Sequence, residues 1–360
     1  MSEPASAEKI QEKAPEKIPV TVLTGYLGAG KTTLLNRILS EPHGKKYAVI
    51  VNEFGEIGID NDLVVGADEE VFEMNNGCIC CTVRGDLVRI LDGLMRRKGK
   101  FDAIIVETTG LADPAPVAQT FFVDENVGRK TRLDAVVTVA DARWLSDRLK
   151  DAPEAKNQIA FADVILINKT DLVSGEELSE VEARIRGINP YAKVHRTERA
   201  QIPLNEVLGR NAFDLDRILD LEPEFLADDE DHEHPHGYDH GHDHDHGHEH
   251  AHQHGGLKHY HDEDMQSVSL KSDEPLDPDK FFPWVQDLVQ KEGPNILRSK
   301  GILSFKNDDD RFVFQGVHMI LDGNHQRPWN KDEKRNSRIV FIGRNLSEEK
   351  IRQGFASCIA

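Results

Sequence analysis

A glycine-rich stretch near the N-terminus has the residue types and spacing that bind phosphate. The stretch GYLGAGKT, residues 25–32, fits the pattern G-x-x-x-x-G-K-[ST], and it lies between an apolar run at 19–25 and a segment of helical periodicity at 32–40. In such a loop the backbone N–H groups surround phosphate oxygens, the lysine amine reaches the β- and γ-phosphates, and the threonine hydroxyl binds Mg²⁺. We therefore predict a nucleoside triphosphate site. Its expected residues are Gly25, Tyr26, Leu27, Gly28, Ala29, Gly30, Lys31, Thr32 and Thr33.

A second motif, NKTD at residues 168–171, concerns the base of the nucleotide. It directly follows the apolar run at 164–167. The Asp171 carboxylate can accept hydrogen bonds from guanine N1–H and from the exocyclic amine, whereas adenine offers no such pair of donors. The motif therefore predicts that the bound nucleotide is GTP. The alternative is a P-loop enzyme that uses ATP. The residues expected to contact the base or brace its loop are Asn168, Lys169, Thr170 and Asp171.

Two acidic segments are candidates for the loops that respond to the presence of the γ-phosphate. VETTG, residues 106–110, ends an apolar run on Glu107, where Mg²⁺ and its waters should lie, and the Gly110 N–H could contact the γ-phosphate. NEFGEIGID, residues 52–60, is a glycine-punctuated acidic loop and a candidate first switch. We expect Mg²⁺ to be bound by Thr32 and Glu107. The predicted catalytic residues are Lys31, Glu53, Asp60 and Glu107.

Three of the four cysteines, Cys78, Cys80 and Cys81, lie within four positions just after the turn signal Asn76-Gly77. Neighbouring cysteines rarely reach the geometry of a disulfide. Thiolates are soft ligands that favour Zn²⁺ or Cu(I) over Mg²⁺, and they also accept Co²⁺. Three thiolates leave one tetrahedral position open, so the ion can be passed on. We therefore predict a transferable metal site, with zinc as the first expectation.

Composition narrows the class of protein. The formal net charge is −20, and residues 226–264 hold twelve Asp or Glu against one Lys, which argues against nucleic acid as a partner. Four cysteines fit a reducing compartment. The apolar runs have the length of strands rather than membrane spans, and the N-terminus lacks the apolar core of a signal peptide. We expect a cytoplasmic protein with no membrane partner.

The pattern of apolar residues predicts two folded parts. From residue 19 to about 219, β-branched runs alternate with helical periodicity, which indicates a mostly parallel sheet covered by helices. The later segments read as β-α-β-β-β-α, with a single strand over 311–322. The expected organisation is a disordered lead at 1–18, an α/β P-loop nucleoside-triphosphatase domain at 19–221, a flexible His- and Asp-rich loop at 222–264, and a smaller α+β C-terminal domain at 265–360.

The loop at 222–264 carries thirteen histidines between His232 and His261 and almost no apolar residues, so it cannot form a packed core. Imidazoles interleaved with carboxylates offer weak sites for Zn²⁺, Ni²⁺, Co²⁺ or Cu²⁺. A metal reservoir and a plain solvated linker both fit this composition. In the C-terminal domain, we expect His318 and Cys358 to be core residues rather than ligands, and by elimination we expect this domain to dock a client.

Taken together, GYLGAGKTT, NEFGEIGID, GCICC, ETTG, NKTD, the His-rich insert and the C-terminal α+β domain resemble the CobW family of metal-handling P-loop GTPases. The resemblance runs from about residue 19 to the C-terminus. It implies a slow, Mg²⁺-dependent GTPase that acts as a metallochaperone, most often for zinc, with Cys78, Cys80 and Cys81 as the metal ligands. The GTPase domain is also similar to those of the nickel-handling GTPases of hydrogenase and urease maturation, which implies a homodimer.

The resemblance leaves the client protein unidentified. Eukaryotic zinc-delivering members carry an N-terminal motif with Cys-Pro that docks methionine aminopeptidase, and residues 1–18 contain no cysteine. Other members act in cobalamin or nitrile hydratase maturation, and the sequence does not choose among these pathways. The competing hypothesis is a metal buffer or storage protein, in which the histidine segment holds the metal and GTP binding is regulatory.

Overall fold

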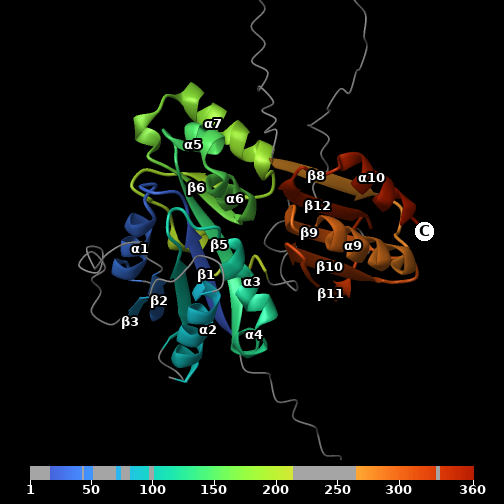
Figure 1. The fold of residues 1–360 in the computed structure, drawn as a ribbon, viewed down its shortest axis with the longest axis horizontal. Helices are drawn as coiled ribbons and strands as arrows, with labels where there is room; N and C mark the ends of the chain where they lie inside the picture. The colour runs from blue at the N-terminus through green and yellow to red at the C-terminus, as the bar shows by residue number, and fades with distance from the viewer. Residues whose placement is uncertain are drawn as a thin grey trace, which may run out of the picture.

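The computed structural model describes residues 17–42, 44–51, 70–73, 82–96, 101–213, 265–329 and 333–360. These residues form two sheets in two packed parts, seen side by side in Figure 1. The first part is a parallel sheet with helices, and the second is an antiparallel sheet with two helices. The fold class expected from the sequence is therefore confirmed. The domain boundaries stay predictions, because residues 1–16 and 214–264 lie outside the described ranges.

The first sheet has seven parallel strands in the order β3-β2-β4-β1-β5-β6-β7. Because all strands run in one direction, every carboxyl end lies at the same edge, where open α/β sheets bind their ligands. β4 and β6 are buried along their whole length, as their apolar runs predict. The strands are β1 (Ile18–Thr24), β2 (Tyr47–Val51), β3 (Glu70–Glu73), β4 (Ala103–Glu107), β5 (Thr131–Asp141), β6 (Val164–Asn168) and β7 (Lys193–Arg196).

The helices of this part connect the strands. The connections from β1 to β2 and from β2 to β3 run toward the β3 side of the sheet, whereas the connections from β3 to β7 run toward the β7 side. Right-handed crossovers therefore place α1 on one face of the sheet and α2–α7 on the other. α7 begins at a capping box formed by Ser174 and Glu177. The helices are α1 (Lys31–Ser40), α2 (Thr82–Met95), α3 (Ala115–Val123), α4 (Glu125–Lys130), α5 (Leu145–Asp151), α6 (Pro153–Phe161) and α7 (Gly175–Ile188), with 3₁₀ turns η2 (Thr170–Leu172) and η3 (Leu204–Glu206).

The second sheet is antiparallel, in the order β11-β10-β9-β12-β8. One face carries phenylalanines such as Phe314 and Phe341, which share an apolar cluster with Phe281 of α9 and Phe355 of α10. Cys358 is buried in this cluster, which confirms that it is a core residue. The elements are β8 (Met265–Ser272), α9 (Pro278–Glu292), β9 (Ile296–Ser304), β10 (Asp310–Val317), β11 (Ile320–Pro328), β12 (Ser337–Arg344) and α10 (Glu348–Ser357).

The single strand predicted over 311–322 was wrong. The chain turns at His318 and Met319, and β10 and β11 pair back from Val317 to Ile320. His318 has a φ of +53°, the left-handed conformation that a two-residue hairpin turn requires. No Gly or Asn marks this turn, so the apolar pattern on both sides reads as continuous.

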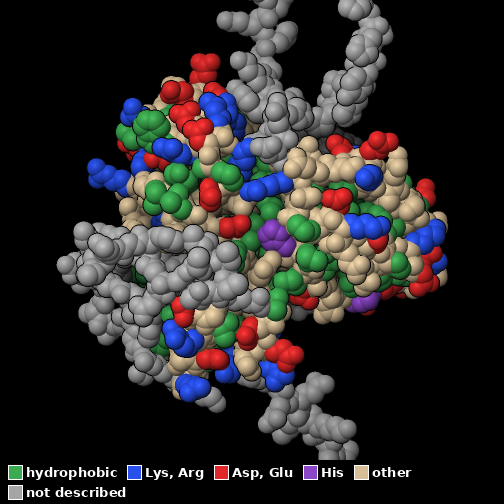
Figure 2. Space-filling view, viewed as in Figure 1, with side chains coloured by type: hydrophobic (Ala, Val, Ile, Leu, Met, Phe, Trp, Pro, Cys, Tyr) green, Lys and Arg blue, Asp and Glu red, His purple; other side chains and the backbone are tan. Residues whose placement is uncertain are grey.

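The other face of the antiparallel sheet packs against the first part. Val313, Val340 and Ile342 belong to the same apolar cluster as the parallel sheet. Arg298 of β9 forms a buried ion pair with Asp163, which precedes β6. On the face shown in Figure 2, acidic and basic side chains intermingle over both parts. Within the described residues, no helix combines the length and apolarity needed to cross a membrane.

Candidate nucleotide site

The P-loop turns at the carboxyl end of β1, and its glycines are required by geometry. Gly25 and Gly30 have φ values of +139° and +113°, which L-residues rarely adopt. A Cβ on Gly25 would lie 2.1 Å from the Val139 oxygen, and one on Gly30 would lie 2.5 Å from Asn168 Nδ2. α1 begins at Lys31 without a side-chain cap, so its first N–H groups can bind an anion.

Lys31 lies buried under this loop. Its Nζ donates to the carbonyl oxygen of Gly25 at 2.9 Å and more weakly to that of Tyr26 at 3.4 Å. Burial lowers the pKa of Lys31, and the negative charge of Glu107 opposes that change. Glu107 is the last residue of β4 and is itself buried. Lys31 and Glu107 are therefore brought together, as their predicted roles require.

The oxygens near Glu107 suit a hard divalent cation. Thr108 donates its hydroxyl to Thr24 Oγ1 at 2.9 Å and its N–H to the Leu23 oxygen, which fixes the end of β4 against β1. The half-buried Thr32 opens α1 next to Lys31. Carboxylate and hydroxyl oxygens are the ligands that Mg²⁺ prefers, so the residues present fit this ion.

The NKTD motif meets the P-loop directly. Asn168 is buried, and its Nδ2 donates to the Ala29 oxygen at 2.9 Å. Its Oδ1 accepts from the Ala200 N–H at 2.8 Å and from the Thr197 hydroxyl at 3.2 Å. Asp171 lies exposed in η2, where a ligand can reach it. One side chain therefore joins the phosphate loop, the guanine motif and the loop that follows β7.

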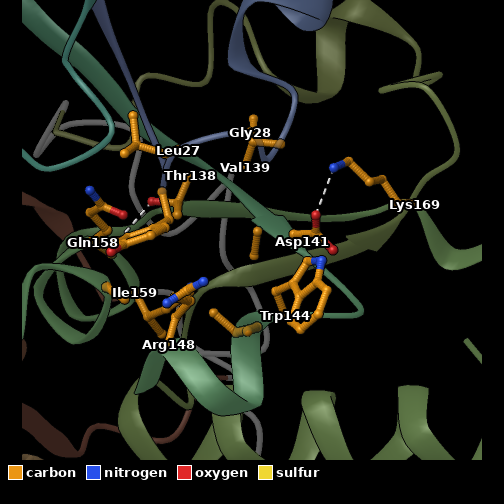
Figure 3. Close-up of a pocket in the computed structure, with 14 residues that line it drawn as sticks. Leu27, Gly28, Thr138, Val139, Asp141, Trp144, Arg148, Gln158, Ile159 and Lys169 are labelled. Carbon is orange, nitrogen blue, oxygen red and sulfur yellow. Dashed lines mark hydrogen bonds and ion pairs between the residues drawn. The ribbon is translucent and has the colours of Figure 1, made fainter. Parts of the chain in front are cut away.

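Asp141 is a site residue that was not predicted from the sequence. This residue ends β5, and its Oδ2 pairs with Lys169 Nζ at 2.7 Å (Figure 3). Lys169 has a φ of +62°, so the pair holds an unusual backbone conformation in the NKTD motif. The signal was present, because Asp141 ends an apolar strand just as Glu107 does. Thr197 and Ala200, in contrast, carry no such signal in the sequence.

A cavity of about 420 Å³ opens beside the P-loop. Tyr26, Leu27, Trp144 and Gln158 are among its lining residues (Figure 3). The Arg148 guanidinium lies 5.3 Å from the centroid of the Tyr26 ring. Lys31, Thr32 and Asp171 do not line this cavity, so it flanks the expected phosphate groove rather than coinciding with it.

The loop after β4 touches the P-loop closely. A Cβ on Gly110 would lie 2.5 Å from the Leu27 backbone nitrogen. Gln158 is buried in α6, and its Nε2 donates to the oxygens of Gly110 and Ala112, both at 3.1 Å. Gly110 is therefore fixed against the P-loop from one side and held by α6 from the other.

The remaining predicted site residues cannot be placed. Glu53, Asp60, Cys78, Cys80 and Cys81 lie outside the described residues. Where the chain is described, no three His, Cys, Asp or Glu side chains gather into a metal site. The described neighbours are Glu73, at the carboxyl end of β3, and Thr82, at the start of α2. Glu73 lies at the same edge of the sheet as the P-loop.

The chain is similar to known nucleotide-binding proteins. Residues 19–196 match the CobW/HypB/UreG nucleotide-binding domain, and residues 265–359 match the C-terminal domain of the cobalamin synthesis protein CobW. The zinc chaperone YjiA of Escherichia coli K12 is 34% identical over 346 residues, which cover 94% of this chain and 98% of that protein. This chain belongs to the CobW family. The resemblance expected from the sequence motifs is thereby confirmed.

Other CobW relatives agree over most of their length. The zinc-regulated GTPase metalloprotein activator 1 of Schizosaccharomyces pombe is 35% identical, over 92% of this chain and 83% of that protein. The crystal structure of Zn(II)-bound YjiA GTPase from E. coli superimposes with a TM-score of 0.72 at 30% identity, covering 96% of this chain and all of that one. The similarity therefore includes both parts of the fold.

Proposed function

We propose that this CobW-family protein is a GTPase that carries zinc as a metallochaperone and releases it to a client protein when GTP is hydrolysed. The observation that carries the GTPase part of the proposal is the position of Asn168, which belongs to the guanine motif and whose side chain donates to the phosphate loop. The relatives that this chain matches over most of their length are named as zinc chaperones or zinc-regulated GTPases.

Each described residue has a definite task in this proposal. The N–H groups from Gly28 to Thr32 bind the phosphates, and Lys31 exchanges its carbonyl partners for phosphate oxygens. Asp171 selects guanine through a pair of accepted hydrogen bonds. Mg²⁺, held by Thr32 and Glu107, would neutralise charge on the phosphates. Lys169 fixes the NKTD loop through its ion pair with Asp141.

Metal and nucleotide are coupled through the shared edge of the sheet. Cys78, Cys80 and Cys81 bind the zinc ion as thiolates, with Co²⁺ as the next best cargo. Their segment leaves the sheet after Glu73, at the edge where Gly110 contacts the P-loop. Loss of the γ-phosphate changes what Gly110 contacts, and this change loosens the thiolate segment. Glu53 or Asp60 orients the attacking water.

A second copy of this chain is the expected neighbour at this edge. Leu27, Leu111, Trp144 and Leu172 are large apolar side chains that are each about half exposed, and all follow carboxyl ends of the parallel strands. Apolar side chains gathered beside a polar site are typical of an interaction surface. We place the homodimer in the cytoplasm, where thiolates stay reduced, and expect neither nucleic acid nor membrane as a partner.

The test separates a chaperone from a metal buffer. A chaperone that lacks residues 232–261 keeps its zinc-dependent GTP hydrolysis, whereas a buffer loses nearly all of its zinc capacity. The matched variant keeps the histidine segment and changes Cys78, Cys80 and Cys81 to Ser. It should lose the zinc dependence of hydrolysis while retaining weak zinc binding. Zinc-dependent hydrolysis that survives the serine changes but not the deletion would favour the buffer.

A further inference from the structure

A chain of polar contacts crosses from the C-terminal sheet to the loop that follows Gly110. Arg344, the last residue of β12, donates from Nη2 to Asn157 Oδ1 at 2.6 Å. Asn157 donates from Nδ2 to Asp113 Oδ2 at 2.8 Å. Asp113 accepts the Ala115 N–H at 2.9 Å, at the start of α3. The second domain is thereby linked to the end of the ETTG loop.

Asn157 suits this place chemically. An amide presents an acceptor on one side and donors on the other, so it can bridge a guanidinium and a carboxylate in a single orientation. Asn157 is only 7% exposed, so a lost partner would not be replaced easily by water. The orientation of its amide is therefore set jointly by Arg344 and Asp113.

The neighbouring residue completes the support of the loop. The Gln158 side chain donates to the backbone oxygens of Gly110 and Ala112, and the backbone oxygen of Gln158 accepts the Thr138 hydroxyl at 2.7 Å. Two adjacent α6 side chains thus hold residues 110–113 by three hydrogen bonds. Because Gly110 has no room to move toward Leu27, a displacement of this loop changes its contact with the P-loop.

His318 lies at the same boundary, in the turn between β10 and β11. Its ring centroid is 5.6 Å from that of Phe161 in α6. Burial lowers the pKa of His318; the Asp113 charge and a contact with the Gly293 backbone oppose this, and the Arg344 charge adds to it. The charges of Asp113 and Arg344 therefore both reach His318.

We propose that Arg344 is a positioning residue of the GTPase site, which acts through Asn157 to hold loop 110–113 against the P-loop. The C-terminal domain then sets the rate of GTP hydrolysis, although none of its residues needs to contact the nucleotide. The inference rests on the proposed role of Gly110 in reading the γ-phosphate.

The experiment measures kcat and KM for GTP in the full-length protein. Arg344→Ala removes the contact at the domain boundary. Asn157→Asp keeps the acceptor for Arg344 but sets a carboxylate against Asp113. We expect each change to lower kcat about fivefold or more, with KM for GTP within about twofold of wild type. Because both act on one chain of contacts, the double variant should be no slower than the slower single variant.

Two variants serve as controls. Tyr191→Phe removes another hydrogen bond across the boundary, between the Tyr191 hydroxyl and Ser269 Oγ at 2.9 Å. This bond lies away from the loop, so the change should leave kcat unchanged. Arg344→Lys keeps the charge and should recover part of the rate, and it tests the idea even where Arg344→Ala folds poorly.

Two outcomes would overturn the inference. The first is a kcat in Arg344→Ala or Asn157→Asp no lower than that of Tyr191→Phe. The second is a rise in KM at constant kcat, which would assign the chain of contacts to nucleotide binding. Gly110→Ala separates the two proposals. Slow hydrolysis in Gly110→Ala, whose added Cβ would meet Leu27, beside a normal kcat in Arg344→Ala, would remove the positioning by Arg344 and keep the proposed role of Gly110. Unchanged hydrolysis in Gly110→Ala would remove both.

Discussion

The two sheets of this protein place their polar side chains differently. In the parallel sheet, β4 and β6 are apolar up to their last residues, Glu107 and Asn168, which reach the nucleotide site. In the antiparallel sheet, polar residues such as Arg298, Lys300 and Gln315 occur within the strands and are buried. A buried polar residue at the end of a parallel strand therefore serves the nucleotide site, whereas one within an antiparallel strand has a different role.

The buried polar residues of the second sheet serve the boundary between the two parts. Arg298 pairs with Asp163, at the amino end of β6, and its guanidinium lies 4.4 Å from the centroid of the Phe213 ring. Gln315 donates to the Phe213 oxygen at 2.9 Å. These contacts hold the domains together at the edge away from the P-loop. A polar residue inside such a strand therefore indicates docking, whereas one at the carboxyl end of a parallel strand indicates chemistry.

The largest expected effect comes from breaking the boundary ion pair. Arg298→Ala leaves the Asp163 carboxylate buried without its charged partner, which should lower the free energy of unfolding by about 3–5 kcal/mol. Urea unfolding followed by circular dichroism measures the change. The paired substitution of Arg298→Met with Asp163→Asn should recover most of the loss, because Asn can still accept from the Val136 N–H. Full stability in Arg298→Ala would contradict the assigned role.

Lys31→Ala tests the opposite edge of the sheet. We expect kcat to fall by about 10²–10³-fold, because the γ-phosphate loses a preorganised positive charge. Steady-state phosphate release measures this rate, and Lys150→Ala, an exposed change on α5, is the matched control. The two changes at opposite edges sharpen the comparison, since Lys31→Ala should affect hydrolysis far more than Arg298→Ala does.

Asp171→Asn tests the choice of base. The amide replaces one acceptor by a donor, which should weaken GTP hydrolysis by about 100-fold and improve the use of xanthosine triphosphate. Measuring kcat/KM for both nucleotides gives the specificity ratio. An unchanged ratio would favour the ATP-using alternative and remove guanine from the account.

The pH dependence of stability should show a smaller effect at His318. Its pKa is lowered from 6.5 in the folded protein, so the unfolded chain binds the proton more readily. Stability is therefore lost as pH falls below about 6.5, through the lowered pKa. His318→Gln should reduce this loss without abolishing it, because burial lowers the pKa of His195 as well. Thermal unfolding at several pH values measures this loss of stability. An unaltered pH profile in His318→Gln would contradict the contribution assigned to His318.

The local features of the candidate site can be recognised in the sequence, whereas the contacts that depend on docking cannot. An acidic residue or NKTD at the end of an apolar run is visible in the sequence, and Asp141 has the same signal. The Arg298–Asp163 pair joins residues that only tertiary packing brings together. Asn157 and Gln158 resemble ordinary helix residues until the loop after β4 and, for Asn157, the second sheet are placed against α6. The turn at His318 was missed because no Gly or Asn occupies the position with the positive φ.

The most direct test of the account is the zinc affinity of the protein in its two nucleotide states. The variant without residues 232–261 removes the weak histidine sites, and a competing chelator reports zinc affinity with Mg²⁺ and either GDP or a non-hydrolysable GTP analogue. We predict affinities that differ by about 5–150-fold, with the difference lost when Cys78, Cys80 and Cys81 are changed to Ser. Equal zinc affinities in the two states would contradict the coupling of metal and nucleotide.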